Sequence, residues 1–74
     1  WFMSKPWRIC ISSPPDREKL VAEIFYGDHQ WAEVNQEGSV LQIEIYPRMD
    51  GQPWRIPYEQ VIHVLEEAKK QLVD

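Results

Sequence analysis

Cysteine, histidine, glycine and basic residues are all scarce in this 74-residue chain, and each scarcity excludes a class of protein. The single cysteine, Cys10, cannot form an intrachain disulfide, which excludes a disulfide-stapled secreted domain and favours a cytoplasmic location. The two histidines, His29 and His63, have no short spacing to Cys10, so no metal site is predicted. The three glycines are isolated from one another, which excludes a glycine-rich phosphate loop, and no cofactor is expected.

Positive charge is also in deficit. Eight Lys and Arg residues against twelve Asp and Glu residues give a net charge of −4. A surface of this sign is unsuited to nucleic acid or to an anionic membrane, and it favours a basic protein partner. No apolar run approaches about 18 residues, so no transmembrane helix is predicted. The first residues also lack the basic-then-apolar layout of a signal peptide.

Apolar residues are abundant enough for one small core. They make up 43% of the chain, with 12% aromatic residues, which excludes a disordered tail. Seventy-four residues give a single domain over 1–74. Met3 resembles a natural start, so we take residues 1–2 as an addition outside the fold. We expect residues 3–7 to form a mobile N-terminal segment.

The middle of the chain predicts β-strands with two distinct faces. Residues 8–12, 20–26 and 31–46 have the apolar alternation of strands, and the last of these stretches contains a turn. A two-residue turn at Glu37-Gly38 would pair Val34 with Leu41 and keep apolar residues on one face. That face consists of Ala22, Ile24, Ala32, Val34, Leu41, Ile43 and Ile45.

The hairpin formed by residues 20–35 has two candidate registers. Phe25 opposite Trp31 makes an aromatic pair, but it also sets Glu23 against Glu33. A shift of two residues separates the carboxylates and loses the aromatic pair. The sequence leaves both registers open.

The last part of the chain predicts a helix. Tyr58, Val61, Ile62, Leu65, Ala68 and Leu72 would form its apolar stripe. The expected fold class is therefore α+β, with a three- to four-stranded antiparallel meander and one C-terminal helix packed on one face.

The sheet face opposite that helix is the candidate functional site. No segment of the chain obviously covers it, and aromatic anchors within a charged rim are typical of a protein interface. The predicted partner-binding residues are Glu23, Phe25, Trp31, Glu33, Glu44 and Tyr46. No catalytic residue is predicted, because a histidine base needs a pocket and an orienting partner. Trp7 and Trp54 each follow a proline, and either could belong to the core or to an interface.

The run Ile-Tyr-Pro-Arg-Met-Asp-Gly-Gln-Pro-Trp over residues 45–54, followed by the charged helix at 65–70, resembles a segment of small, mostly uncharacterised bacterial proteins. The likeness extends back through residues 21–24 and 31–34. In size and acidity such proteins are similar to the immunity partners of bacterial toxins. The resemblance implies an inhibitor of a basic toxin or nuclease, and it implies no catalytic residue.

The sequence therefore leaves three candidate functions. The first is a non-catalytic inhibitor of the immunity or antitoxin type, which binds a basic protein through the acidic and aromatic sheet face. The second is a self-associating structural or adaptor module that forms a homodimer through a strand edge or this same face. The third is a small-ligand sensor or accessory subunit that uses the Pro47–Pro57 loop and His63.

Overall fold

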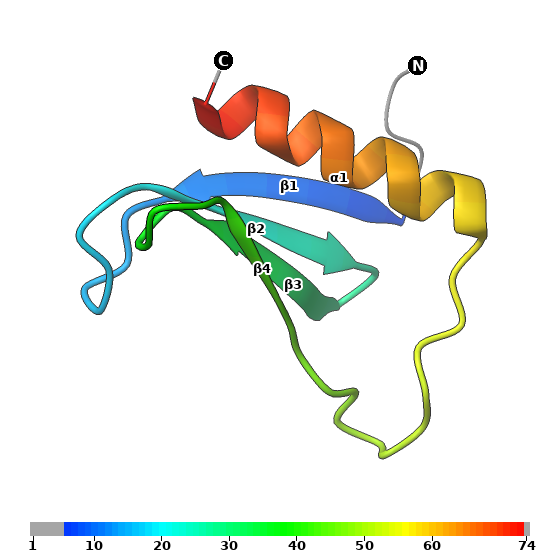
Figure 1. Cartoon of the computed structure of the whole chain (residues 1–74). Coiled ribbons are helices and arrows are strands. Elements are labelled where there is room, and N and C mark those ends of the chain that lie inside the picture. The colour runs from blue at the N-terminus through cyan, green and yellow to red at the C-terminus, as the bar shows by residue number, and fades with distance from the viewer. Residues whose placement is uncertain (1–5, 74) are drawn as a thin grey trace.

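Four strands precede one helix in the computed structural model, which describes residues 6–73 (Figure 1). The elements are β1 (Trp7–Ser12), β2 (Val21–Tyr26), β3 (His29–Asn35), β4 (Gln42–Ile45) and α1 (Tyr58–Val73). The strands form one antiparallel sheet in the order β1-β2-β3-β4, so each strand pairs with its neighbour in sequence. The predicted α+β meander with a C-terminal helix on one face is confirmed.

The β2–β3 hairpin adopts one of the two predicted registers, with one change. Glu23 lies opposite Glu33. The register then shifts after Ile24, so that Phe25 faces Gln30 and Trp31 becomes the extra residue of a β-bulge. Gly27 has a φ of 65° at the first central position of the two-residue turn, as a type II′ turn requires.

The β3–β4 connection is longer than predicted. Val34 pairs with Ile43 and not with Leu41, and residues 36–41 form the loop. The two-residue turn at Glu37-Gly38 was therefore a wrong prediction, because Gly38 does not have a positive φ and Glu37 bonds to another loop. The error is two residues, so each side chain keeps its predicted face.

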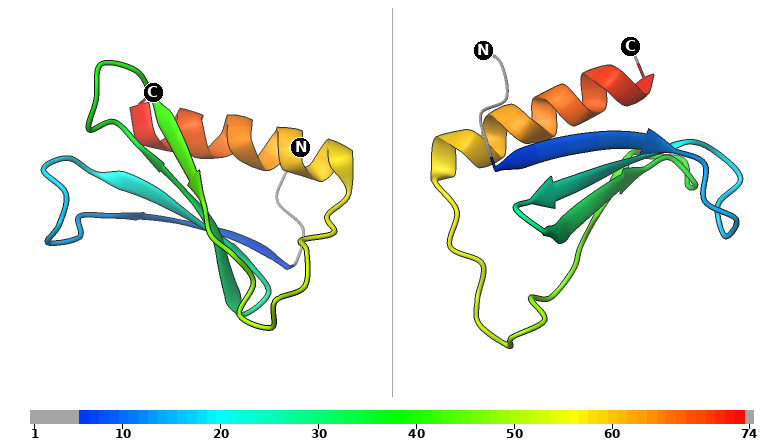
Figure 2. Two further views of the ribbon diagram at one scale, coloured as in Figure 1. Left: turned by 60° about the horizontal axis from the view of Figure 1, so that its bottom comes forward. Right: turned by 180° about the vertical axis from the view of Figure 1, so that it is seen from behind.

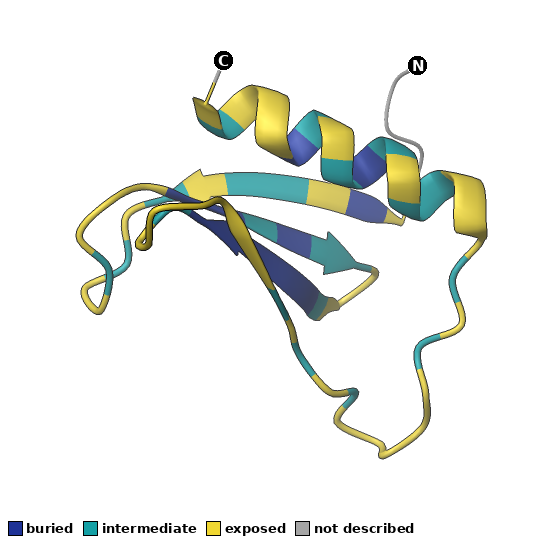
Figure 3. Ribbon diagram, viewed as in Figure 1, coloured by how far each residue is buried: buried dark blue, intermediate teal, exposed yellow. Residues whose placement is uncertain are grey.

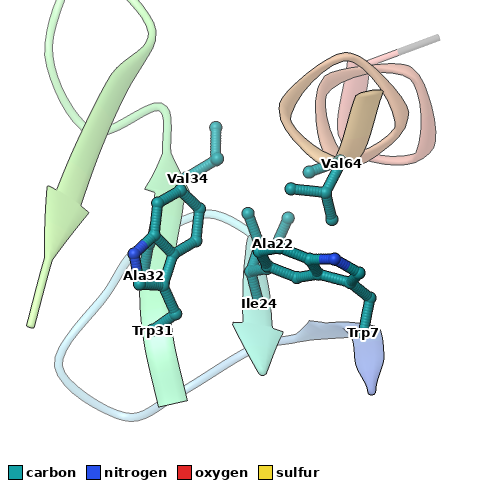
Figure 4. Packing of buried hydrophobic residues seen from close by; sticks show 8 residues of the cluster. Trp7, Ala22, Ile24, Trp31, Ala32, Val34 and Val64 are labelled. Carbon is teal, nitrogen blue, oxygen red and sulfur yellow. The ribbon is translucent and has the colours of Figure 1, made fainter. Parts of the chain in front are cut away.

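The core lies between α1 and the first three strands (Figures 3 and 4). Val64 and Ala68 of α1 are fully buried, whereas Tyr58 and Ile62 are exposed. The apolar stripe is thus centred on Val64, which the predicted stripe omitted. The buried cluster consists of Trp7, Ala22, Ile24, Trp31, Ala32, Val34, Val64 and Ala68.

The helix covers only part of the sheet. It packs on β1 and β2. Figure 2 shows the helix lying across one face of the sheet, and Figure 4 shows β4 at the sheet edge away from it. A helix about 10 Å across covers roughly two strands spaced about 4.8 Å apart. Leu41, Ile43 and Ile45 were predicted to be core, but they are 38–59% exposed. The sheet is simply wider than its one helix.

The N-terminal prediction is corrected at its last residue. Trp7 is 5% exposed, packs edge-on against Trp31, and donates from Nε1 to Oε1 of Gln60 in α1 at 2.9 Å. It belongs to the core and not to a mobile segment. The remaining predictions for residues 1–5 lie outside the residues that the structure describes.

Candidate functional site

Three glutamates form a row across the sheet face opposite α1. Glu23 of β2 pairs with Glu33 of β3, which in turn pairs with Glu44 of β4. We call these three residues the carboxylate row. Like charges directly opposite each other destabilise a sheet, so their neighbours must compensate.

Arg17 provides that compensation from the β1–β2 loop. Its Nη2 lies 2.9 Å from Oε2 of Glu33 and also forms an ion pair with Oε2 of Glu44. Asn35 donates from Nδ2 to the same two oxygens, at 2.7 Å for Glu44 and 3.3 Å for Glu33. Within residues 6–73, Arg17 is the only cation that forms an ion pair with the row, so two negative charges of the three stay uncompensated.

Glu33 lies at the centre of this network and is 5% exposed. Its Oε1 accepts a hydrogen bond from the Tyr46 hydroxyl at 3.4 Å. Burial raises the pKa of Tyr46, and the negative charges of Glu33 and Glu44 raise it further. The phenol therefore stays protonated, and it keeps donating to Glu33 at neutral pH.

The β1–β2 loop covers one end of this face. Glu37 accepts the backbone N–H groups of Glu18 and Lys19 at 3.0 and 3.1 Å. The Glu18 hydrogen bond in particular lowers the pKa of Glu37, although desolvation opposes it. Val21, which alternation places on this face, is fully buried. The expectation that no segment covers the face is therefore wrong at this end, because residues 13–20 fold back to bring Arg17 over the row.

Phe25 lies on the same face as the row and is half-buried. The Arg8 guanidinium sits 4.2 Å above its ring, which is a cation–π distance. Arg8 also donates from Nη1 to Sγ of Cys10 at 3.6 Å. This aromatic ring is therefore covered on one side by a cation.

Trp31 does not belong to this face. The β-bulge turns its side chain to the helix side, where it is 5% exposed and contacts the Trp7 ring at a centroid distance of 5.6 Å. The structure thus brings five of the six predicted partner-binding residues together and places Trp31 in the core. It adds Arg17 and Asn35. The sequence did not identify them, because neither a charged loop residue nor an amide in a strand indicates which side chain it will contact.

The Pro47–Pro57 loop packs at the other end of β3 and β4. Trp54 donates from Nε1 to the Tyr46 carbonyl at 2.7 Å and contacts the rings of Tyr26 and His29. The Arg48 guanidinium lies 5.5 Å from the Trp54 ring centroid and binds Asp50 at 2.7 Å. A hollow of about 290 Å³ lies beside it, lined by Asp28, His29, Gln30, Tyr46, Pro47 and Met49.

An apolar groove lies on the helix side of β4. Its volume is about 300 Å³, and it separates β4 from α1. Val34, Leu41, Ile43 and Leu65 form its floor and walls, and Gln42, Glu66 and Lys69 form its polar rim. The groove is the uncovered half of the sheet's apolar face.

Two further findings concern the residues that the structure describes. Over residues 6–73, no group of three or more His, Cys, Asp or Glu side chains is arranged to hold a metal ion. Over the same residues, α1 is too polar and too short to span a bilayer. Comparison of the chain with protein-family models, with curated proteins and with solved structures found no match.

Proposed function

We propose that this protein is a non-catalytic binding protein of the immunity or antitoxin type, which inhibits a basic protein by binding it with the sheet face opposite α1. The observation that carries the proposal is the carboxylate row, which forms ion pairs with one cation, Arg17, among residues 6–73. A net charge of −4 over the whole chain has the same sign. Complementary charge of this kind accelerates association and selects against other acidic proteins.

The residues of this face have different roles in binding. Glu23 and Glu44 are half-buried and offer carboxylate oxygens to lysine or arginine side chains. Glu33 is too buried to contact a partner, and it instead holds Arg17 and Tyr46 in place. Phe25 and Tyr46 are half-buried aromatics on the same side of the row, one near its β2 end and one near its β4 end, and they serve as the apolar anchors.

The test is capture from the native host, with variants matched in charge. Glu23→Gln combined with Glu44→Gln removes two negative charges from the row, the same change in net charge as Glu67→Lys, while leaving Glu33 paired with Arg17. Glu67→Lys, on the helix and away from this face, is the control for charge alone. The proposal expects a basic protein that wild type and Glu67→Lys capture, that the double variant loses, and whose activity the wild-type protein inhibits.

Two results would refute the proposal. One is equal capture by the double variant and the wild type, which would remove the carboxylate row from the interface. The other is a captured protein whose activity is unchanged by a saturating amount of this domain. Circular dichroism of the double variant confirms that any loss of binding is not a loss of fold.

A further inference from the structure

The exposed edge of β4 has a backbone ready to pair with another strand. Tyr46 donates its N–H to the Trp31 carbonyl at 2.9 Å, so the backbone groups of Tyr46 point toward β3. Successive residues of a strand alternate in this respect, and Gln42 and Glu44 therefore also point toward β3. The N–H and C=O groups of Ile43 and Ile45 point the other way, to the side where the sheet ends.

The side chains of the same strand define what would fit beside it. Ile43 and Ile45 are 41% and 59% exposed and border the apolar groove next to α1. On the opposite face, Glu44 is the last member of the carboxylate row, and its side chain is 43% exposed. A strand added here would place alternate side chains beside an apolar groove and beside Glu44, which shares its one cation, Arg17, with Glu33.

The other edge of the sheet differs from this one. β1 lies beneath α1, and Trp7 and Ile9 on its helix side pack against the core. Figure 4 shows β4, the pale green strand at the left, at the edge of the sheet away from the helix. Strand addition at β4 would therefore cover apolar surface that the protein's own fold leaves exposed.

We propose that β4 binds an extended segment of the basic partner as a fifth strand, with apolar side chains toward the groove and a lysine or arginine opposite Glu44. This inference rests on the proposed function and assigns the recognition mode, which is β-strand addition. Backbone hydrogen bonds to Ile43 and Ile45 supply the pairing. The carboxylate row and the groove select alternation of basic and apolar residues.

A second copy of this chain is the competing occupant, and its charge suits the edge less well. Self-pairing with Ile43 opposite Ile43 sets Gln42 against Glu44, and pairing of Ile43 with Ile45 sets Glu44 against Glu44. Neither register brings a cation to the row, and each joins two chains of net charge −4. A basic strand relieves the repulsion that a second copy would increase.

The test uses a synthetic β-hairpin peptide with an Asn-Gly turn, because a preorganised strand loses less entropy on binding. The strand of the hairpin that is meant to pair with β4 alternates valine and lysine. Two controls change the peptide: one has glutamate in place of lysine, and the other is N-methylated at the amides that would face β4. The third control is the Glu67→Lys variant of the protein. Amide exchange followed by NMR gives the site, and titration gives the affinity.

The expected result is protection of the Ile43 and Ile45 amides by the lysine hairpin, equal in wild type and Glu67→Lys. N-methylation and the glutamate substitution should each weaken binding by at least about tenfold, which is about 1.4 kcal/mol. Both controls act on the peptide, so the fold of the protein is unaffected.

The outcomes separate this inference from the proposed function. One outcome is that the double variant Glu23→Gln with Glu44→Gln abolishes binding while N-methylation leaves it unchanged. This would overturn strand addition and leave the acidic face as the partner site. Protection of Ile43 and Ile45 that rises with protein concentration without any hairpin would assign the edge to a second copy. No binding of the lysine hairpin at low ionic strength would also overturn the inference, while capture of a basic inhibited protein would still support the proposed function.

Discussion

Replacing Trp31 with alanine should unfold most of the protein. The side chain is 5% exposed and contacts Trp7 edge-on, and removing a buried tryptophan costs about 3–5 kcal/mol. A domain of fewer than 80 residues gains only about 3–5 kcal/mol from its core, so the loss is as large as the whole stability. A solvent-exposed side chain would show no such effect.

The milder Trp31→Phe keeps an aromatic ring at this position and makes the loss measurable. We expect a decrease of about 2 kcal/mol in the free energy of unfolding. With a urea slope of about 1 kcal/mol per molar, the unfolding midpoint then falls by about 2 M. Urea titration followed by circular dichroism and by tryptophan fluorescence measures this shift, and coincidence of the two curves confirms two-state unfolding.

Tyr58→Ala is the matched control, because Tyr58 is an aromatic residue that is 76% exposed at the start of α1. Its free energy of unfolding should change by no more than about 0.5 kcal/mol. The reasoning would be refuted if Trp31→Ala unfolded at the wild-type urea concentration. That result would mean that the bulge in β3 does not turn this side chain into the core.

Three further predictions concern single groups. Gly27→Ala should cost about 1–2 kcal/mol in thermal or urea unfolding, because Gly27 has a positive φ, whereas Gly38→Ala should be harmless. The hydrogen bond from Arg48, followed by that from the Gln52 N–H, lowers the pKa of Asp50 to about 2. The stabilising contribution of the Asp50 carboxylate is therefore complete above about pH 4 and lost as the pH falls through about 2. An NMR titration of Asp50 should show a midpoint near this pKa, and Arg48→Gln should raise the midpoint. Glu33→Gln should lower the pKa of Tyr46, measured by tyrosinate absorbance, because one of the charges that raise it is removed; an unchanged value would leave burial as its cause.

The sequence predicted the parts of the fold that depend on a period of two residues. Alternation assigned faces correctly along β2 and β4, and a register error of two residues in the β3–β4 hairpin left those faces unchanged. The fold class followed from the same pattern and from the helical spacing after Pro57. These features are local, so a single sequence contains them.

The features that the sequence did not predict depend on contacts between distant residues. The bulge moved Trp31 from the predicted site to the core, where Trp7 fills the space beside it. Arg17 reaches Glu44, which is 27 residues away, because Glu37 fixes the backbone of the β1–β2 loop. No alternation or spacing rule identifies a partner at that separation. The sequence also did not predict that one helix would cover only part of the sheet.

The hydrogen bond between Trp7 and Gln60 joins residues 53 positions apart, and this separation bears on the order of folding. The three hairpins of the meander close short loops, so their loss of chain entropy is small and each can form early. Docking of α1 on β1 closes a much longer loop, so we expect it to complete the core after the sheet has formed. During synthesis, the apolar surface of the sheet would then stay exposed until α1 has been made. The nascent chain is most prone to aggregate in that interval.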